Sequence, residues 1–180
     1  MSSLKGFIPG LARHLAISPL ALYERQRALV RAGLLAAPQE RRRGLGGGIQ
    51  ATAPSVALLL VAVLATDNLS ETEERAAAVA AGEIQSRKLP FSHLPKFKDA
   101  LAAVVLQEGL CRQVEEVRVS RTTGRATVRF KASSRFGTAE FGFARIGAGI
   151  QVEASIGAEI LRRICADLSA IIEATVGDAQ

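Results

Sequence analysis

The stretch LARHLAISPLALY, residues 11–23, predicts two short helices that meet at a tight corner. Ser18 is a favoured N-cap residue and Pro19 a favoured first residue of a helix, so the second helix is expected to begin here. Gly33 can end it, because glycine readily adopts the left-handed conformation that follows many helices. The first helix is expected over about residues 7–16.

The net charge of the chain lies in the same region. Residues 1–50 hold eight Lys and Arg against two Glu, which accounts for the whole formal net charge of +6 of this 180-residue chain. Residues 51–180 hold fifteen residues of each sign. Clustered Lys and Arg can replace the counterions condensed on a nucleic acid, so this asymmetry indicates a polyanionic partner for the N-terminal region.

A basic hairpin is expected after the second helix. Residues 34–37 and 48–52 can pair as two short strands. The intervening loop, residues 38–47, is rich in glycine and contains Arg41, Arg42 and Arg43. Such a loop can serve as a wing beside the two helices.

Three residues have the character that a helix-turn-helix requires. Ala12 is small where the two helices would cross, Ile17 is apolar at the corner, and Leu22 is an apolar anchor in the second helix. With these residues, the segment from about residue 6 to residue 52 resembles the winged helix-turn-helix superfamily of DNA-binding proteins. Ala16 stands where that superfamily often has glycine. The lack of a helix ahead of the pair is similar to MerR-like proteins, and the Ala- and Arg-rich composition is similar to phage-type regulators, so the subfamily stays open.

The resemblance implies that the second helix enters the major groove of duplex DNA and that the wing reaches phosphate or the minor groove. A rotation of 100° per residue from the apolar positions of this helix puts Arg27 and Arg31 on its exposed face and Arg25 nearer its buried side. Tyr23 flanks the exposed face and could donate to a phosphate. The expected DNA-binding residues are Arg13, Ser18, Tyr23, Arg27, Arg31, Arg41, Arg42 and Arg43.

Residues 53–84 predict two central helices. The segment 54–66 is apolar on nearly all sides, which predicts burial between other elements or in a subunit interface. The run Ser70-Glu71-Thr72-Glu73 matches a capping box and predicts a helix to about Ile84. A loop is expected over residues 85–95 and a third helix over 94–108, ended by Gly109.

The hydrophobic period then changes from that of helices to that of strands. Apolar and polar residues alternate over 117–131 around the turn Thr122-Thr123-Gly124, and two further short strands are expected near 141–143 and 150–152. Apolar residues at helical spacing follow from Ile156. The fold class is therefore α+β: a winged helix-turn-helix over residues 1–52, then a domain over 53–180 with central helices and a four-stranded antiparallel meander covered by a C-terminal helix.

The sequence favours no metal, cofactor or catalytic site. His14 and His93 lack neighbours at ligand spacing, Cys111 and Cys165 form no motif, and no Gly-x-Ser-x-Gly elbow occurs. Arginines of the sheet region alternate with glutamates, as on an ordinary solvated sheet face. The longest apolar run, Val56–Ala65, is too short to cross a membrane, and no apolar signal segment is visible, so a cytoplasmic, nucleoid-associated protein is expected.

These patterns predict a sequence-specific transcriptional regulator that binds double-stranded DNA as a homodimer, with the helix at 54–66 as the first candidate interface. RNA polymerase or another regulator is a further candidate partner of the C-terminal part. The alternative is a non-catalytic protein-interaction module, antitoxin-like or a phage accessory protein, whose basic N-terminus docks on an acidic protein. An enzyme is the least favoured class.

Overall fold

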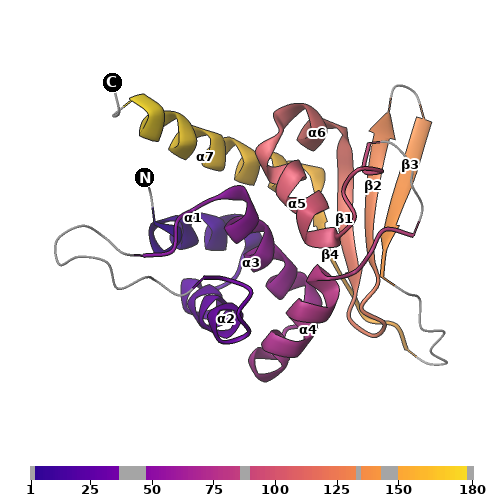
Figure 1. Ribbon diagram of the computed structural model, residues 1–180, viewed down its shortest axis with the longest axis horizontal. Helices are drawn as coiled ribbons and strands as arrows, with labels where there is room; N and C mark the ends of the chain where they lie inside the picture. The colour runs from indigo at the N-terminus through magenta and orange to yellow at the C-terminus, as the bar shows by residue number, and fades with distance from the viewer. Residues whose placement is uncertain (1–2, 37–47, 86–89, 133–134, 143–149, 178–180) are drawn as a thin grey trace.

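The computed structural model describes residues 3–36, 48–85, 90–132, 135–142 and 150–177, and it places a layer of helices against one face of an antiparallel sheet (Figure 1). The α+β class is confirmed. The elements are α1 (Leu4–Leu15), α2 (Pro19–Arg31), α3 (Ala53–Ala65), the 3-10 turn η1 (Leu69–Glu71), α4 (Thr72–Ala80), α5 (Phe97–Leu106), α6 (Glu108–Gln113), β1 (Val114–Ser120), β2 (Ala126–Ala132), β3 (Arg135–Phe141), β4 (Glu153–Gly157) and α7 (Ala158–Gly177).

The predicted corner between the first two helices is confirmed. The Ser18 side chain accepts a hydrogen bond from the Ala21 amide at 3.2 Å and caps α2, and Pro19 is the first helical residue. Gly33 follows the helix with φ of +68°. At the corner Ala16 adopts the left-handed conformation, with φ of +53° and ψ of +38°.

Replacing Ala16 with glycine is expected to raise the free energy of unfolding by about 0.5–1 kcal/mol. The left-handed conformation strains a residue with a Cβ by about 1–2 kcal/mol, and glycine removes that strain while losing more backbone entropy on folding. Ala16 is exposed, so no packing is lost. The matched control is Ala78→Gly at an exposed position of α4, which should lower stability by about 0.5–1 kcal/mol. Urea denaturation followed by circular dichroism measures both, and equal destabilisation would contradict the strain at the corner.

The predicted wing strands are not formed by the described residues on either side of the loop. The amides of Leu34 and Leu35 both donate to the Leu29 carbonyl and close the end of α2. On the other side, Gln50 forms a β-bridge with Ser3, and the Leu4 amide donates to the Ile49 carbonyl at 2.7 Å. This returning segment therefore pairs with the start of α1 rather than with residues 34–36. The predicted wing tip, residues 38–47 with its three arginines, lies outside the described residues.

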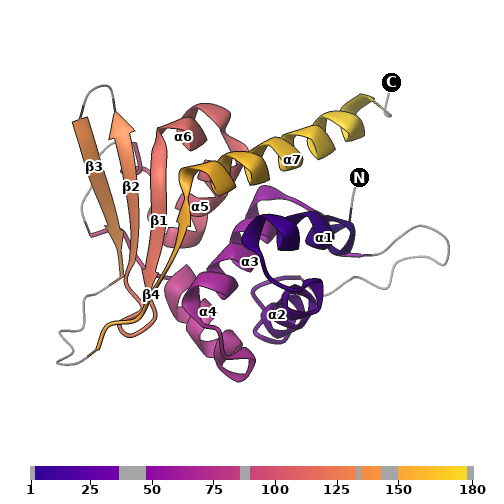
Figure 2. The ribbon, with the colours of Figure 1, turned by 180° about the vertical axis from the view of Figure 1, so that it is seen from behind.

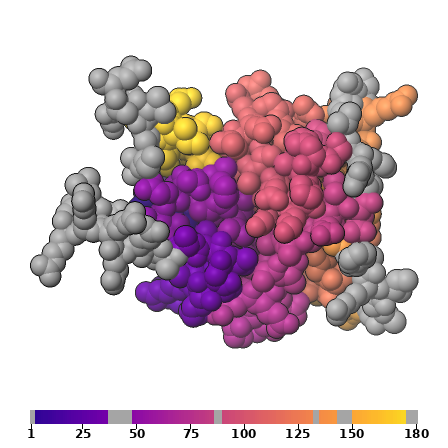
Figure 3. Space-filling model, in the orientation of Figure 1, coloured from indigo at the N-terminus to yellow at the C-terminus, as the bar shows by residue number. Residues whose placement is uncertain are grey.

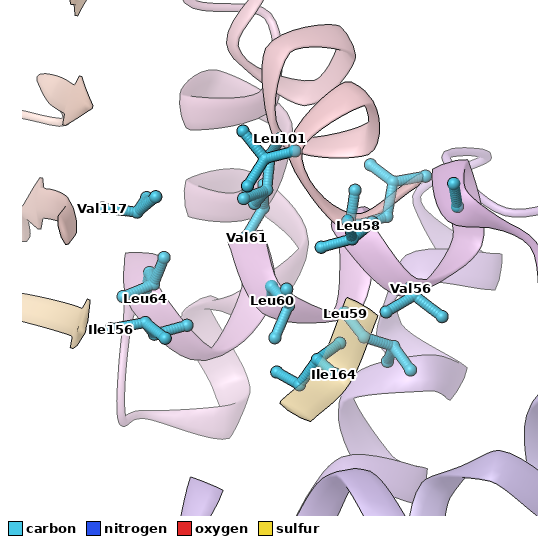
Figure 4. Close-up of a cluster of buried hydrophobic side chains, with 14 of the residues drawn as sticks. Val56, Leu58, Leu59, Leu60, Val61, Leu64, Leu101, Val117, Ile156 and Ile164 are labelled. Carbon is cyan, nitrogen blue, oxygen red and sulfur yellow. The ribbon is translucent and has the colours of Figure 1, made fainter. Parts of the chain in front are cut away.

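Helix α3 is the centre of the molecule, and eleven of its thirteen residues are buried. Thr52 and Ser55 form a capping box at its start. Figure 4 shows Val61 beside Leu101 of α5 and Leu64 beside Ile156 of β4. The core is continuous from α1 and α2 through α3 to the sheet, so it crosses the expected domain boundary at residue 52.

The burial of α3 confirms the prediction that this segment lies between other elements and corrects its alternative, that the helix is the first candidate for a subunit interface. An interface helix must expose side chains to its partner, whereas Leu60 is fully buried within its own chain. Helices α2, α4 and α5 all pack directly against α3.

The four-stranded antiparallel sheet is confirmed, but its strand order is β3-β2-β1-β4. The fourth strand pairs with the first, with Val117 opposite Ile156, and so the sheet is not the simple meander that was expected. The first turn is as predicted: Gly124 lies in it with φ of +75°. Only the beginning of α7 lies against β4 and β1; the rest runs away from the sheet over α5, α6 and α1 (Figure 2).

Four helix boundaries in the middle of the chain differ from the prediction. Asn68 caps the 3-10 turn η1, where its side chain accepts from the Ser70 amide at 3.1 Å, and α4 itself begins after Glu71 without a side-chain cap. Helix α4 ends at Ala80, and α5 begins only at Phe97. Gly109 does not end a helix but lies inside the short helix α6.

Candidate nucleic-acid interface

One side of α2 carries an exposed stripe, which we name the α2 outer face and define as Leu20, Glu24, Arg27 and Arg31. Their spacing of four, three and four residues puts them above one another on a helix. Leu20 is 67% exposed, and the side chains of Arg27 and Arg31 are 72% and 59% exposed. The opposite side of α2 is buried. In the space-filling view, the N-terminal helices form the surface farthest from the sheet (Figure 3).

Both arginines of the α2 outer face contact a carboxylate. Arg27 Nη1 lies 2.8 Å from Glu24 Oε1 on the same helix. Arg31 Nε lies 2.5 Å from Glu73 Oε1, which belongs to the first turn of α4. These ion pairs are open to solvent, where such pairs contribute about 0.2–1 kcal/mol each, so an anionic ligand can displace the carboxylates.

The other predicted DNA-binding residues do not belong to the α2 outer face. Arg13 is exposed in the last turn of α1. Ser18 is exposed, but its hydroxyl oxygen serves as the cap of α2. Tyr23 is half-buried, and its hydroxyl donates to the Lys5 carbonyl at 3.3 Å, so it ties α2 to α1. The three arginines at 41–43 lie outside the described residues.

Arg25 lies on the buried side of α2, as the helical rotation predicts, and fastens α2 to the end of α3. Its Nη2 donates to the carbonyls of Thr66 at 3.2 Å and Asp67 at 3.4 Å. Burial lowers the pKa of Arg25, the nearby charge of Arg121 lowers it further, and Asp67 opposes both effects. The role of Arg25 is therefore to hold α2 in place rather than to contact a ligand.

Arg121, from the turn after β1, binds the same end of α3 from the other side. It donates to the carbonyls of Leu64 at 3.2 Å and Val63 at 3.3 Å, and its Nη1 lies 2.9 Å from Asp67 Oδ2. Two guanidinium groups thus satisfy carbonyls at a helix C-terminus, where positive charge is favourable. Arg25 and Arg121 together connect the helix pair to the sheet.

A second connection joins α1 to α7. His14 Nε2 lies 2.8 Å from Asp167 Oδ2, and the two residues are 153 positions apart in the sequence. The contact fixes the end of α1 that leads into the corner. The helix pair that carries the α2 outer face is therefore connected to the rest of the chain at two places, through Arg25 and Arg121 and through His14.

Several charged groups on the outer face of the sheet pair with one another. Arg118 contacts Glu116 and Glu153 at 3.0 Å, and Arg125 contacts Glu140. The hydrogen bond that the Arg118 guanidinium donates to Glu116 is the main reason that the pKa of Arg118 is raised. The structure thus agrees with the interpretation of this face as an ordinary solvated surface rather than a second nucleic-acid surface.

The two cysteines lie in the core between α6 and α7. Both are buried, and burial, followed by the neighbouring thiol of Cys165, raises the pKa of Cys111 to about 12. A thiol with so high a pKa is protonated near neutral pH and is a poor nucleophile. These cysteines therefore act as small apolar core residues.

Within the described residues, side chains of His, Cys, Asp and Glu nowhere gather in groups of three that could hold a metal ion. In the same part of the chain, no helix combines the length and apolarity that a membrane crossing requires.

Three contributors to this surface, Leu20, Glu24 and Glu73, were not among the predicted site residues. Leu20 and Glu24 could be found by the same 100° rotation, which puts them beside Arg27 and Arg31. Glu73 could not, because its contact with Arg31 spans 42 residues and depends on how α4 packs.

The chain matches no protein-family model, no curated protein and no solved structure.

Proposed function

We propose that this protein is a transcriptional regulator that binds double-stranded DNA through the α2 outer face. The observation that carries the proposal is the pair of arginines, Arg27 and Arg31, one turn apart on the exposed side of the second helix of a corner-joined pair. A single α-helix fits the major groove, which is about 12 Å wide. A rigidly held exposed helix of this kind can reach base edges and phosphates together.

Charge supports a polyanionic partner. The whole formal net charge of +6 resides in the first fifty residues, whereas the charges on the outer face of the sheet pair with one another. Association with a duplex releases about 0.9 counterion per phosphate contact, which favours binding at low salt.

The residue types on the α2 outer face suit base recognition. Arg27 can form a bidentate contact with guanine, and the exposed Leu20 can contact the methyl group of thymine. Arg31, in the last turn of α2, is placed for a phosphate contact. In this assignment Leu20 and Arg27 determine sequence preference, and Arg31 contributes affinity.

A homodimer remains part of the proposal, since two copies on adjacent half-sites raise affinity and specificity. The interface must use a surface other than the buried helix α3. Recruitment of RNA polymerase or another regulator would use the C-terminal part of the chain.

The direct test is fluorescence anisotropy with a pool of labelled duplexes of about 25 base pairs. Arg27→Ala/Arg31→Ala should weaken binding by about ten-fold or more, and the slope of log affinity against log salt should become shallower by about 1, because Arg31 is the one of the two assigned to a phosphate. The matched control is Arg112→Ala/Arg163→Ala, because these arginines of α6 and α7 are 70% and 59% exposed and also pair with carboxylates. The control removes the same amount of positive charge from a different surface of the protein.

Three outcomes of this test separate the alternatives. Binding that only the first variant loses supports the proposal. Equal loss in both variants would mean that net charge alone governs binding and would contradict a defined interface. Wild-type protein that prefers an acidic polypeptide to duplex DNA would favour the protein-interaction module instead.

A further inference from the structure

We propose that Glu73 competes with DNA phosphate for Arg31, so that the start of α4 sets the DNA affinity of the α2 outer face. This inference rests on the function proposed above and concerns the regulation of the same surface. It starts from the 2.5 Å contact between Arg31 Nε and Glu73 Oε1, which joins two separate helices.

The position of Glu73 is fixed by its surroundings. The preceding residue, Thr72, is fully buried, and its hydroxyl donates to the Asn68 carbonyl at 3.4 Å. Glu73 itself is the second residue of α4, where the helix dipole stabilises a negative charge. The start of α4 therefore presents this carboxylate beside Arg31.

The partner of Glu73 is also placed favourably. Arg31 lies in the last turn of α2, where the negative end of the helix dipole favours a cation. The pair therefore satisfies both helix ends at once. Glu73 occupies Nε of Arg31, one of the donors that a two-point contact with a phosphate can use, so the carboxylate and a phosphate compete for this guanidinium.

Glu24 differs from Glu73 in this respect. It lies on α2 itself, three residues before Arg27, and moves with the helix that carries its partner. Its charge therefore faces any ligand of the α2 outer face, independently of how the other helices are positioned. The contact through Glu73 depends instead on the distance between α2 and α4, so displacement of the start of α4 would free Arg31 and raise DNA affinity.

The expected effect is small but measurable. An exposed ion pair contributes about 0.2–1 kcal/mol, which corresponds to about 1.5- to 5-fold in an equilibrium constant. Glu73→Gln should tighten duplex binding by this factor near 50 mM salt, and by less at 200 mM because salt screens exposed charges.

A double-mutant cycle tests the inference on the full chain by fluorescence anisotropy with the same duplex pool. Glu73→Gln is compared in the wild-type background and in the Arg31→Ala background. The matched control is Glu159→Gln: Glu159 is likewise the second residue of a helix, α7, and pairs with an exposed arginine, Arg163. Thermal unfolding by circular dichroism checks that each variant is folded.

The inference predicts tighter binding for Glu73→Gln that disappears in the Arg31→Ala background and exceeds the effect of Glu159→Gln. An equal gain in both backgrounds would show that Glu73 acts only through net charge and would overturn the inference while leaving the proposed function intact. No gain at all would also overturn it. Wild-type protein that binds no duplex would overturn both the inference and the proposed function.

Discussion

Replacing Leu60 with alanine is expected to lower the free energy of unfolding by about 2–5 kcal/mol. Leu60 is fully buried in the middle of α3, and Figure 4 shows it near Ile164 of α7. Truncation removes apolar contacts and leaves a cavity that close-packed neighbours fill only in part. Urea denaturation followed by circular dichroism measures the change.

The control for this substitution is Leu106→Ala. Leu106 is the last residue of α5 and is 50% exposed, so its truncation should cost no more than about 0.5 kcal/mol. Size-exclusion chromatography of Leu60→Ala distinguishes the two roles that the sequence allows for this segment. A stable variant that has only lost its partner would contradict the placement of α3 in the core.

Replacing Arg25 with alanine is expected to lower the free energy of unfolding by about 2–4 kcal/mol. The substitution leaves two carbonyls just after α3 without this donor: that of Thr66, which is buried, and that of Asp67, which is partly buried. An unsatisfied buried polar group costs about 1–3 kcal/mol. Arg25→Lys retains the charge but not the forked geometry, so its loss should be intermediate.

Arg27→Ala is the matched control for Arg25, because it removes the same side chain from the exposed side of the same helix. Its effect on stability should lie within about 0.5 kcal/mol of zero. Chemical denaturation of the three variants under one set of conditions measures the series. Equal stability of Arg25→Ala and Arg27→Ala would contradict the role of Arg25 as the link between α2 and α3.

Features that depend on neighbouring residues were predictable from the sequence. Ser18 and Pro19 mark the start of α2, Gly33 marks its end, and Gly124 marks the first hairpin turn. Each of these acts through its own backbone or through a hydrogen bond a few residues away. The burial of the segment 54–66 was predictable for a similar reason, since it has no polar side on which to meet water.

Features that depend on distant parts of the chain could not be predicted from the sequence. Strand periodicity does not say which strand is the partner, so the pairing of β4 with β1 could not be distinguished from a meander. The segment after residue 47 was expected to pair with residues 34–37, but it contacts the start of α1 instead. Burial of α3 satisfied two predictions equally, a subunit interface and a core, and only its packing within one chain separates them.

In the candidate site, too, the local features were predictable from the sequence and the contacts between distant residues were not. Helical rotation was enough to place Arg27 and Arg31 on the exposed side of α2 and Arg25 on the buried side. It could not show that Tyr23 donates to the Lys5 carbonyl or that Arg31 contacts Glu73. Those contacts arise where helices pack against one another.

The most direct test of the central claim is crosslinking of the protein to DNA in cells, followed by genome-wide sequencing of the bound fragments. The full chain is compared with Arg27→Ala/Arg31→Ala at equal protein abundance. The account predicts discrete wild-type peaks that share one sequence motif and are lost in the variant. Absence of enrichment for the wild-type protein under conditions where it is abundant, or peaks that persist unchanged in the variant, would contradict DNA recognition by the α2 outer face.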